Sequence, residues 1–328
     1  MGESKTTVQR LDEFQRTHRV VGFPIAVLYK YIEDQGNYLA ALITYYAFIA
    51  IFPILLILSS VLGFLLQGNP DLQQSILEGA LAQFPIIGDQ LGAPEGLQGS
   101  TSAVVVGSIA AIYGSLGLGH AGQHLMYVAW AVPRVSRPNP ILLRLRSLLL
   151  VSIAGFLILM LTTAITFAGN LDYLGFEFGG ELEFLILLAT VGATTLLLAL
   201  LFWTAGGRIG RIRTMIPGAL FFALLWQFLQ YFGALYVSLV LARVSSLNAT
   251  FALVLGMLGF LYLTAVTAVM GVEINVVRAR KLYPRALLVL LTDKVELTDA
   301  DRRAYHYYAN SQRYKGFQSV EVDFDTDA

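Results

Sequence analysis

Glu273 is the first candidate for chemistry in this chain, because it is the only acidic residue inside its long apolar stretches. An ionisable group in hydrocarbon costs about 2.5–3.5 kcal/mol on membrane-insertion scales, so it needs a partner or a function. Two interpretations stay open. Glu273 is either a proton-coupling or substrate-binding group inside a helix bundle, or a structural carboxylate that ties its helix to basic loop residues or to a backbone amide.

A second group of polar residues is His120, Gln123 and His124, which follow several glycines in another apolar stretch. His120 and His124 are four residues apart and share one face of a helix. That spacing can hold a metal ion, but no third ligand lies within sequence reach, so we expect no metal. A proton relay or polar packing beside a water-lined cavity is the favoured interpretation. The glycines favour close helix packing over a local break in the helix.

Polar side chains also occur in two further apolar stretches. Gln227, Gln230 and Tyr231 share one helix face, which we expect to point inward because lipid cannot satisfy amide groups. Tyr46 is expected to shape the same cavity, and Pro53 to kink its helix. Ordinary packing of a kinked helix is the alternative.

Basic residues follow the ends of these stretches, and an anionic lipid headgroup is a candidate ligand for them. They also have a simpler role, which is to fix the membrane topology and to contact anionic lipid. The candidates for headgroup binding are Arg134, Arg137, Arg208, Arg211 and Arg213.

Familiar enzyme chemistry finds little support in the sequence. The chain has no Cys, which excludes disulfides and thiolate nucleophiles. We find no Walker A, Gly-x-Ser-x-Gly or His-Glu-x-x-His sequence, which argues against ATP-driven pumping and the commoner hydrolases. We therefore expect no enzyme activity, no cofactor and no metal.

The composition indicates an all-α polytopic membrane protein. Of the 328 residues, 56% are apolar and only 13% are charged, about half the charged fraction of soluble domains. We predict a polar N-terminal segment (1–36), a membrane domain of six spans (37–277) and a polar tail (278–328). The predicted spans are 37–66, 103–132, 148–168, 184–204, 217–241 and 250–277.

Charge asymmetry predicts the orientation of these spans. The segments after spans 2, 4 and 6 are rich in Arg, whereas those after spans 1, 3 and 5 together carry eight acidic residues and Arg243 as their only basic residue. Because basic residues favour the cytoplasmic side, both termini are expected there. Residues 20–34 are too short to span, and we expect an interfacial helix beginning near Pro24. An ordinary linker is equally compatible with this segment.

Three stretches carry a resemblance to a known family. YLAALITYYAFIAIFPILLIL at 38–58, HLMYVAWAVPR at 124–134, and the region from RIRTMIPGAL to GVEI at 211–274 are similar to the YihY/BrkB family of bacterial inner-membrane proteins. The resemblance covers Tyr31 to Val277, and Val272 stands where the family has Ala. It implies a six-helix protein of the inner membrane, sometimes linked to envelope lipid transport. The family's older ribonuclease BN label finds no support, because no metal-ligand cluster and no basic aromatic groove for RNA is visible.

The leading functional hypothesis is a transporter or lipid translocase that does not use ATP and has a polar cavity inside the membrane. Its partners would be membrane lipids and a lipid or small-molecule substrate, with no nucleic acid. The alternative is a scaffolding protein of the cell envelope that acts through the acidic loop at 67–100 and the tail. The substrate and the oligomeric state stay open.

Overall fold

The described part of the chain is helical. The computed structural model describes residues 7–65, 101–169, 180–239, 246–291 and 295–324. In these residues the α-helices are α1 (Thr7–Thr17), α2 (Arg19–Glu33), α3 (Gly36–Leu65), α6 (Thr101–Ala129), α7 (Pro140–Gly169), α8 (Gly180–Ala205), α9 (Ile216–Leu239), α10 (Ser246–Arg280) and α11 (Asp299–Ser311), with short 3₁₀ turns η2 (Arg134–Ser136) and η4 (Ile212–Thr214).

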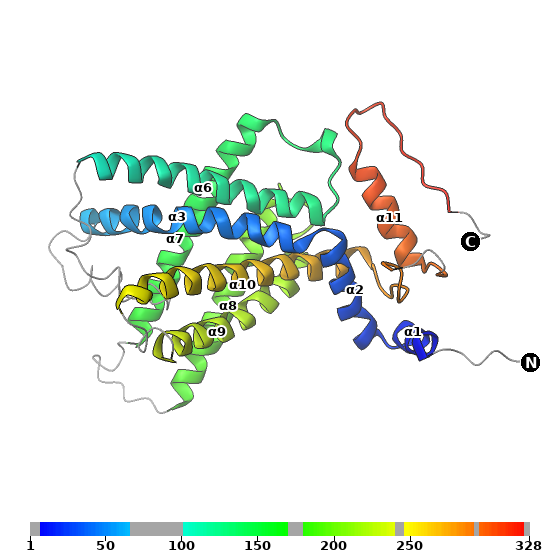
Figure 1. The fold of residues 1–328 in the computed structure, drawn as a ribbon, viewed down its shortest axis with the longest axis horizontal. Coiled ribbons are helices and arrows are strands. Elements are labelled where there is room, and N and C mark those ends of the chain that lie inside the picture. The colour runs from blue at the N-terminus through cyan, green and yellow to red at the C-terminus, as the bar shows by residue number, and fades with distance from the viewer. Residues whose placement is uncertain (1–6, 66–100, 170–179, 240–245, 292–294, 325–328) are drawn as a thin grey trace, which may run out of the picture.

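The long helices form one bundle (Figure 1). Helix α3 packs between α6 and α10, α9 packs between α10 and α8, and α7 packs against α6 and α8. The start of α3 and the ends of α6 and α10 lie at the same end of the bundle, and α1 and α11 lie beyond that end (Figure 1). The short helices α1, α2 and α11 gather there and place their polar residues over the helix ends.

Three described helices are long and apolar enough to cross a membrane: Phe184–Ala205, Ile216–Leu239 and Phe251–Arg280. Helices α3, α6 and α7 are 29 or 30 residues long and match three more predicted spans, although part of each lies where only the backbone is described. The ends of these helices lie within a few residues of the predicted span boundaries. The exception is α7, which begins eight residues before its predicted span. Helix α3 continues through Pro53.

Helices α9 and α10 approach so closely that only glycine fits between them. A Cβ on Gly218 would lie 1.7 Å from the carbonyl oxygen of Gly271. Gly218 is in the first turn of α9, where the backbone N–H groups lack partners within the helix. Its N–H donates instead to Oδ1 of Asn275 on α10, at 2.8 Å. One buried amide therefore fixes the start of α9 against α10.

The glycines of α6 permit close packing, as the sequence predicts. A Cβ on Gly117 would lie 2.0 Å from the ring of Tyr46 on α3, and one on Gly114 would lie 2.8 Å from the backbone nitrogen of Ala50. Gly119 meets the backbone of Ser147 on α7 in the same way, at 2.6 Å. Because α6 is one continuous helix, the alternative of a local break is wrong.

The ends of the chain are more ordered than the sequence predicts. Helix α2 begins at Arg19, with Pro24 inside it, and packs against α10. The predicted polar tail contains α11, a helix that was not predicted, and residues 281–291 run between α10 and that helix. The acidic loop at 67–100, which the scaffolding hypothesis invokes, lies outside the described residues.

Candidate functional site

A cavity of about 430 Å³ opens at the end of the bundle where α3 begins and α6 ends. This volume is within the range of about 300–1,000 Å³ that is typical of ligand pockets. Three segments line it: the α2–α3 corner, the end of α6 with the turn after it, and the end of α11. The lining residues are Glu33, Asp34, Gln35, Tyr38, Leu39, Leu42, His124, Tyr127, Val128, Ala131, Arg134, Arg137, Tyr308, Ser311 and Gln312.

The turn after α6 brings two arginines to the cavity. Ala131 has a positive φ of 41°, which reverses the chain at the end of α6, and Pro133 prevents the helix from continuing. The 3₁₀ turn η2 follows and carries Arg134, with Arg137 directly after it. Helix α7 then begins with a side-chain cap, since Oδ1 of Asn139 accepts the N–H of Leu142 at 2.8 Å.

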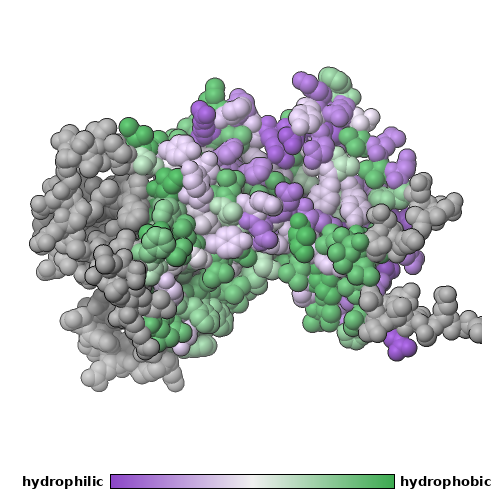
Figure 2. All heavy atoms as spheres, viewed as in Figure 1, coloured by the Kyte–Doolittle hydropathy of each residue, from purple (hydrophilic) through white to green (hydrophobic). Residues whose placement is uncertain are grey.

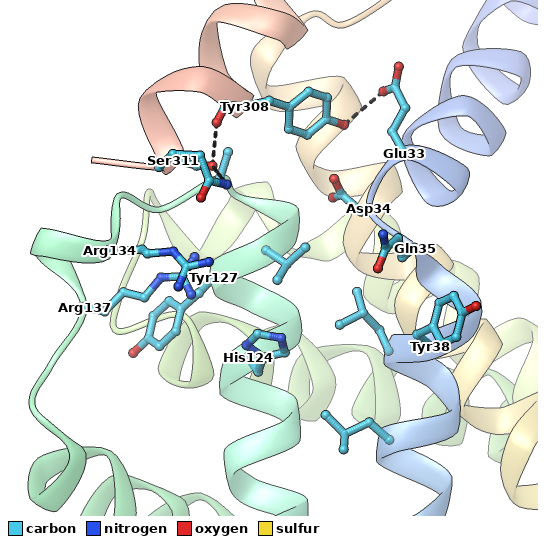
Figure 3. A pocket seen from close by; sticks show the side chains of 15 residues that line it. Glu33, Asp34, Gln35, Tyr38, His124, Tyr127, Arg134, Arg137, Tyr308 and Ser311 are labelled. Atoms are coloured by element: carbon cyan, nitrogen blue, oxygen red, sulfur yellow. Dashed lines mark hydrogen bonds between the residues drawn. The ribbon is translucent and has the colours of Figure 1, made fainter. Parts of the chain in front are cut away.

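The guanidinium groups of Arg134 and Arg137 form one wall of the cavity (Figure 3). Arg134 lies 4.9 Å above the ring of Tyr314, and Arg137 lies 5.7 Å from the ring of Tyr127. Neither forms an ion pair with a carboxylate in the part of the chain that the structure describes. Burial, and then the positive charge of Arg134, lower the pKa of Arg137 from its ordinary value. This wall carries positive charge that no described carboxylate compensates.

The opposite wall is acidic, but buried cations on the side away from the cavity pair with its carboxylates. Asp34 forms a buried ion pair with Lys30, and the Lys30 ammonium lies 3.6 Å from Oε2 of Glu273 on α10. All three side chains are at most 6% exposed. Burial raises the pKa of the Asp34 carboxyl, and the charge of Lys30 opposes that rise.

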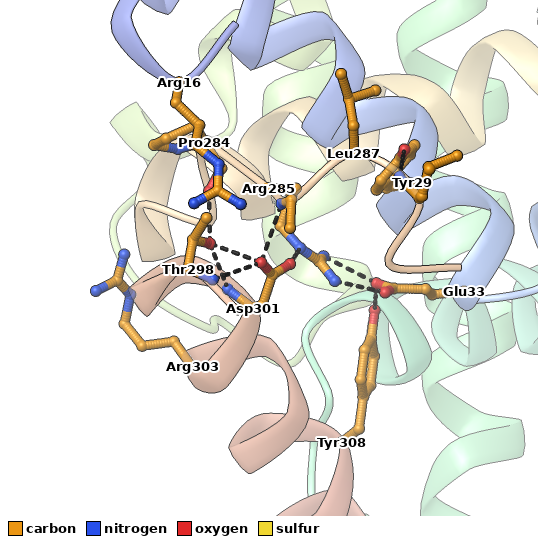
Figure 4. A network of polar contacts seen from close by, with 12 residues as sticks. Arg16, Tyr29, Glu33, Pro284, Arg285, Leu287, Thr298, Asp301, Arg303 and Tyr308 are labelled. Carbon is orange, nitrogen blue, oxygen red and sulfur yellow. Dashed lines mark hydrogen bonds and ion pairs between the residues drawn. The ribbon is translucent and has the colours of Figure 1, made fainter. Parts of the chain in front are cut away.

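Glu33 is held by a second buried network (Figure 4). Arg285 donates to its two carboxylate oxygens at 3.0 and 2.5 Å, and the Tyr308 hydroxyl donates to Oε2 at 2.9 Å. Arg285 also pairs with Asp301. Burial alone would lower the pKa of Arg285, but the hydrogen bonds and charges of Glu33 and Asp301 outweigh it and raise that pKa. Burial, followed by the nearby carboxylates Asp34 and Glu33, raises the pKa of Tyr308, which stays a neutral donor.

Helix α11 is fixed in place by this network and closes one side of the cavity. The Thr298 hydroxyl accepts the N–H of Asp301 at 3.1 Å, and the Asp301 carboxylate accepts the N–H of Thr298, so the helix starts with a capping box. Near its other end, the Arg280 guanidinium lies 3.9 Å from the Tyr307 ring and donates to the carbonyl of Trp130. These contacts join α11 to α10 and to the end of α6.

A family model described as Virulence factor BrkB matches residues 27–288, which is most of the chain. The chain belongs to the BrkB family. No curated protein and no solved structure matches it. The match confirms the resemblance seen in the sequence and includes most of the cavity's lining. Helix α11 lies outside it, so Tyr308, Ser311 and Gln312 come from a part of this BrkB family protein that the family model does not match.

Only some of the predicted site residues meet in the cavity. His124, Arg134 and Arg137 line it, whereas His120 lies one turn away on the exposed face of α6. Glu273 does not line the cavity. It lies behind Asp34, with the Lys30 ammonium 3.6 Å from its Oε2.

Gln123 is buried away from the cavity and ties two helices together. Its Nε2 donates to Oγ of Ser147 at 2.8 Å and to the carbonyl of Leu143 at 3.2 Å. The ring of Tyr46 packs over Gly117 and does not line the cavity. Both residues therefore join α6 to its neighbours.

The remaining candidates lie elsewhere on the BrkB family protein. Gln227, Gln230 and Tyr231 are on α9, and Tyr231 is 68% exposed. The prediction that this whole face points inward is wrong for Tyr231, which faces out from the bundle. Arg208 lies 5.3 Å from the Trp203 ring, and Arg211 and Arg213 are exposed. None of the three lines the cavity.

Several residues of the site were not predicted. Lys30, Glu33 and Asp34 were interpreted as part of an interfacial helix, and Tyr308 as part of a polar tail. One local signal was present, because Lys30 and Asp34 have the i,i+4 spacing of a helical ion pair. No local pattern indicates that Arg285 pairs with Glu33, which is 252 residues away. Among the described residues, no group of three His, Asp or Glu could hold a metal ion.

Proposed function

We propose that this BrkB family protein is a lipid translocase of the bacterial inner membrane that does not use ATP. In this proposal α3, α6, α7, α8, α9 and α10 all span the bilayer, and both termini are cytoplasmic. The cavity is the cytoplasmic entry site for the anionic headgroup of a phospholipid, while the acyl chains stay in the bilayer.

The observation that carries the proposal is the pair Arg134 and Arg137 on the cavity wall. Guanidinium groups bind phosphate through several N–H donors at once, with strong, charge-assisted hydrogen bonds. Both groups lack a carboxylate partner among the described residues, whereas Glu33 and Asp34 opposite are already paired with Arg285 and Lys30. A phosphate can therefore approach the arginines without first breaking an ion pair.

The position of the cavity also supports a lipid ligand. The basic segments of the sequence lie at the end of the bundle where the cavity opens, and basic residues favour the cytoplasmic surface. Each Lys or Arg near an anionic leaflet contributes roughly 1 kcal/mol of attraction. Tyr127 and Tyr38 add amphipathic rings to the lining, which suit the level of the lipid headgroups.

The experiment that tests this function is lipid translocation in reconstituted vesicles. The Cys-free protein is placed in vesicles with fluorescent phosphatidylglycerol, and dithionite reports how fast inner-leaflet lipid becomes accessible. We expect wild type to accelerate exchange over empty vesicles. The double variant Arg134→Gln/Arg137→Gln should lose at least about tenfold, since charged hydrogen bonds contribute about 1.5–3 kcal/mol each.

The matched control is Arg144→Gln/Arg278→Gln, which removes two exposed arginines that do not line the cavity. It should translocate lipid like wild type. A wild-type protein that leaves exchange at the rate of empty vesicles would refute the proposal. Equal losses in the two double variants would show that bulk charge, not the cavity, is responsible.

A further inference from the structure

A row of exposed polar and aromatic side chains leads from the cavity along the outer face of α3 and α6. We call it the polar stripe, and it consists of Tyr38, Tyr45, Tyr113 and His120. Tyr38 is 75% exposed, Tyr45 53% and Tyr113 55%, and His120 is also exposed. Figure 2 shows pale and purple side chains along the face of α3 and α6, with green apolar residues below them toward α9 and α10.

The spacing of these residues places them in two adjacent rows. Tyr38 and Tyr45 are seven residues apart on α3, and Tyr113 and His120 are seven apart on α6, so each pair lies on one helix face two turns apart. The rows meet because the Tyr46 ring lies 5.1 Å from that of Tyr45 and 5.9 Å from that of Tyr113.

The stripe is continuous with the cavity. Tyr38 lines the cavity itself, and His120 is one helical turn from His124, which also lines it. From His124 to Tyr113 the stripe rises about 16 Å along α6, roughly half the thickness of the ~30 Å hydrocarbon core. It therefore extends from the proposed headgroup site well into the depth of the membrane.

Contacts within the protein account for only part of these side chains: Tyr46 meets Tyr45 and hydrogen-bonds with Tyr113, yet Tyr45 and Tyr113 stay more than half exposed. Hydrocarbon cannot hydrogen-bond a phenol or an imidazole, so polar groups at this depth are costly unless a polar ligand or water meets them. On α9 the residues at the same exposure include the apolar Phe228 at 63% and Phe232 at 59%, and a single tyrosine, Tyr231 at 68%, whose ring contacts that of Phe232. No second tyrosine of α9 is exposed to form a row with it.

We propose that the polar stripe is the track along which the headgroup of an anionic phospholipid moves between the cavity and the membrane interior. This inference rests on the proposed function and names its path. The tyrosine hydroxyls and the His120 imidazole replace part of the headgroup's water, and the acyl chains remain in the surrounding lipid.

The chain has no Cys, so single-cysteine variants give one thiol each. Tyr113→Cys and His120→Cys lie on the stripe, and Phe228→Cys on α9 is the control. Each is reconstituted with phosphatidylethanolamine that carries a maleimide on its headgroup nitrogen, which makes the headgroup anionic. The rate of thiol labelling is divided by the rate with N-ethylmaleimide, which enters the bilayer and corrects for thiol reactivity. We expect the corrected rate on the stripe to exceed the control at least tenfold.

Equal corrected rates at all three positions would overturn the track, whether or not wild type moves lipid. Fast labelling on the stripe together with lipid exchange at the rate of empty vesicles would support headgroup access but refute translocation. A second measurement uses Tyr45→Leu/Tyr113→Leu, which should slow exchange at least tenfold while the purified protein keeps its bound lipid. Phe228→Leu is the control, and unchanged exchange in the stripe variant would overturn the track.

Discussion

Lys30→Met removes the cation that pairs with Asp34 and lies beside Glu273, and the structure predicts a large loss of stability. Lys30 pairs with Asp34 and lies 3.6 Å from Glu273, and the three side chains are at most 6% exposed. Met has nearly the volume of Lys, so the variant removes charge without leaving a large hole. Removing one partner of a buried ion pair costs about 3–5 kcal/mol.

The loss of stability in Lys30→Met should depend on pH, and the direction of that dependence follows from the Asp34 carboxyl. Burial raises the pKa of this carboxyl, and without Lys30 only the smaller effects of Glu273 and Tyr308 oppose that rise. The folded state then keeps the proton at pH values where the unfolded state has lost it. The free energy of unfolding therefore falls as pH rises through that window, by up to about 1.4 kcal/mol per unit for one group.

Thermal unfolding in detergent, followed by tryptophan fluorescence from pH 5 to pH 8, measures this effect. We expect Lys30→Met to unfold on the order of 5 °C below wild type at pH 8, with a smaller difference at pH 5. Lys315→Met, at an exposed position, is the control. Lys30→Met/Asp34→Asn should recover part of the loss. A variant as stable as wild type at pH 8, or one equally destabilised at every pH, would refute the reasoning.

Two further predictions concern the packing of α9 and the docking of α11. Gly218→Val should destabilise the bundle by more than about 3 kcal/mol, because its Cβ would meet the Gly271 backbone at 1.7 Å. The control is Gly192→Ala, where a Cβ meets nothing within 4 Å. Equal unfolding temperatures of the two variants would contradict this prediction. Tyr308→Phe should lower the free energy of unfolding in urea by about 2 kcal/mol, because it removes the hydrogen bond to the Glu33 carboxylate while Arg285 still holds Glu33. An unchanged urea midpoint would show that this hydrogen bond contributes nothing to stability.

The bundle could be predicted from the sequence because its signals are local. A run of 30 residues without charge, as in 37–66, is enough to predict a helix such as α3. The glycines of α6 predict close packing, and Gly114 and Gly117 do meet α3. The start of α7 was missed because Arg144 and Arg146 were interpreted as loop residues, although a helix can continue past the membrane surface.

The carboxylate networks could not be predicted, because they join segments that are far apart in the chain. Glu33, Arg285 and Asp301 each belong to a polar segment that reads locally as a solvated surface, and only the fold brings them together. Similarly, the sequence left open whether Glu273 works inside a cavity or ties its helix to basic residues, and the fold places Lys30 against it and Asp34 between it and the cavity. The arginines were better placed, since Arg134 and Arg137 follow directly from the end of α6.

The central claim is that the cavity binds an anionic phospholipid through Arg134 and Arg137. Native mass spectrometry of the detergent-purified protein tests it most directly, with wild type beside Arg134→Gln/Arg137→Gln and the Arg144→Gln/Arg278→Gln control. We predict that wild type and control retain an anionic phospholipid, and that the cavity variant retains at least tenfold less. No retained lipid in folded wild type, or equal retention in all three proteins, would contradict the claim.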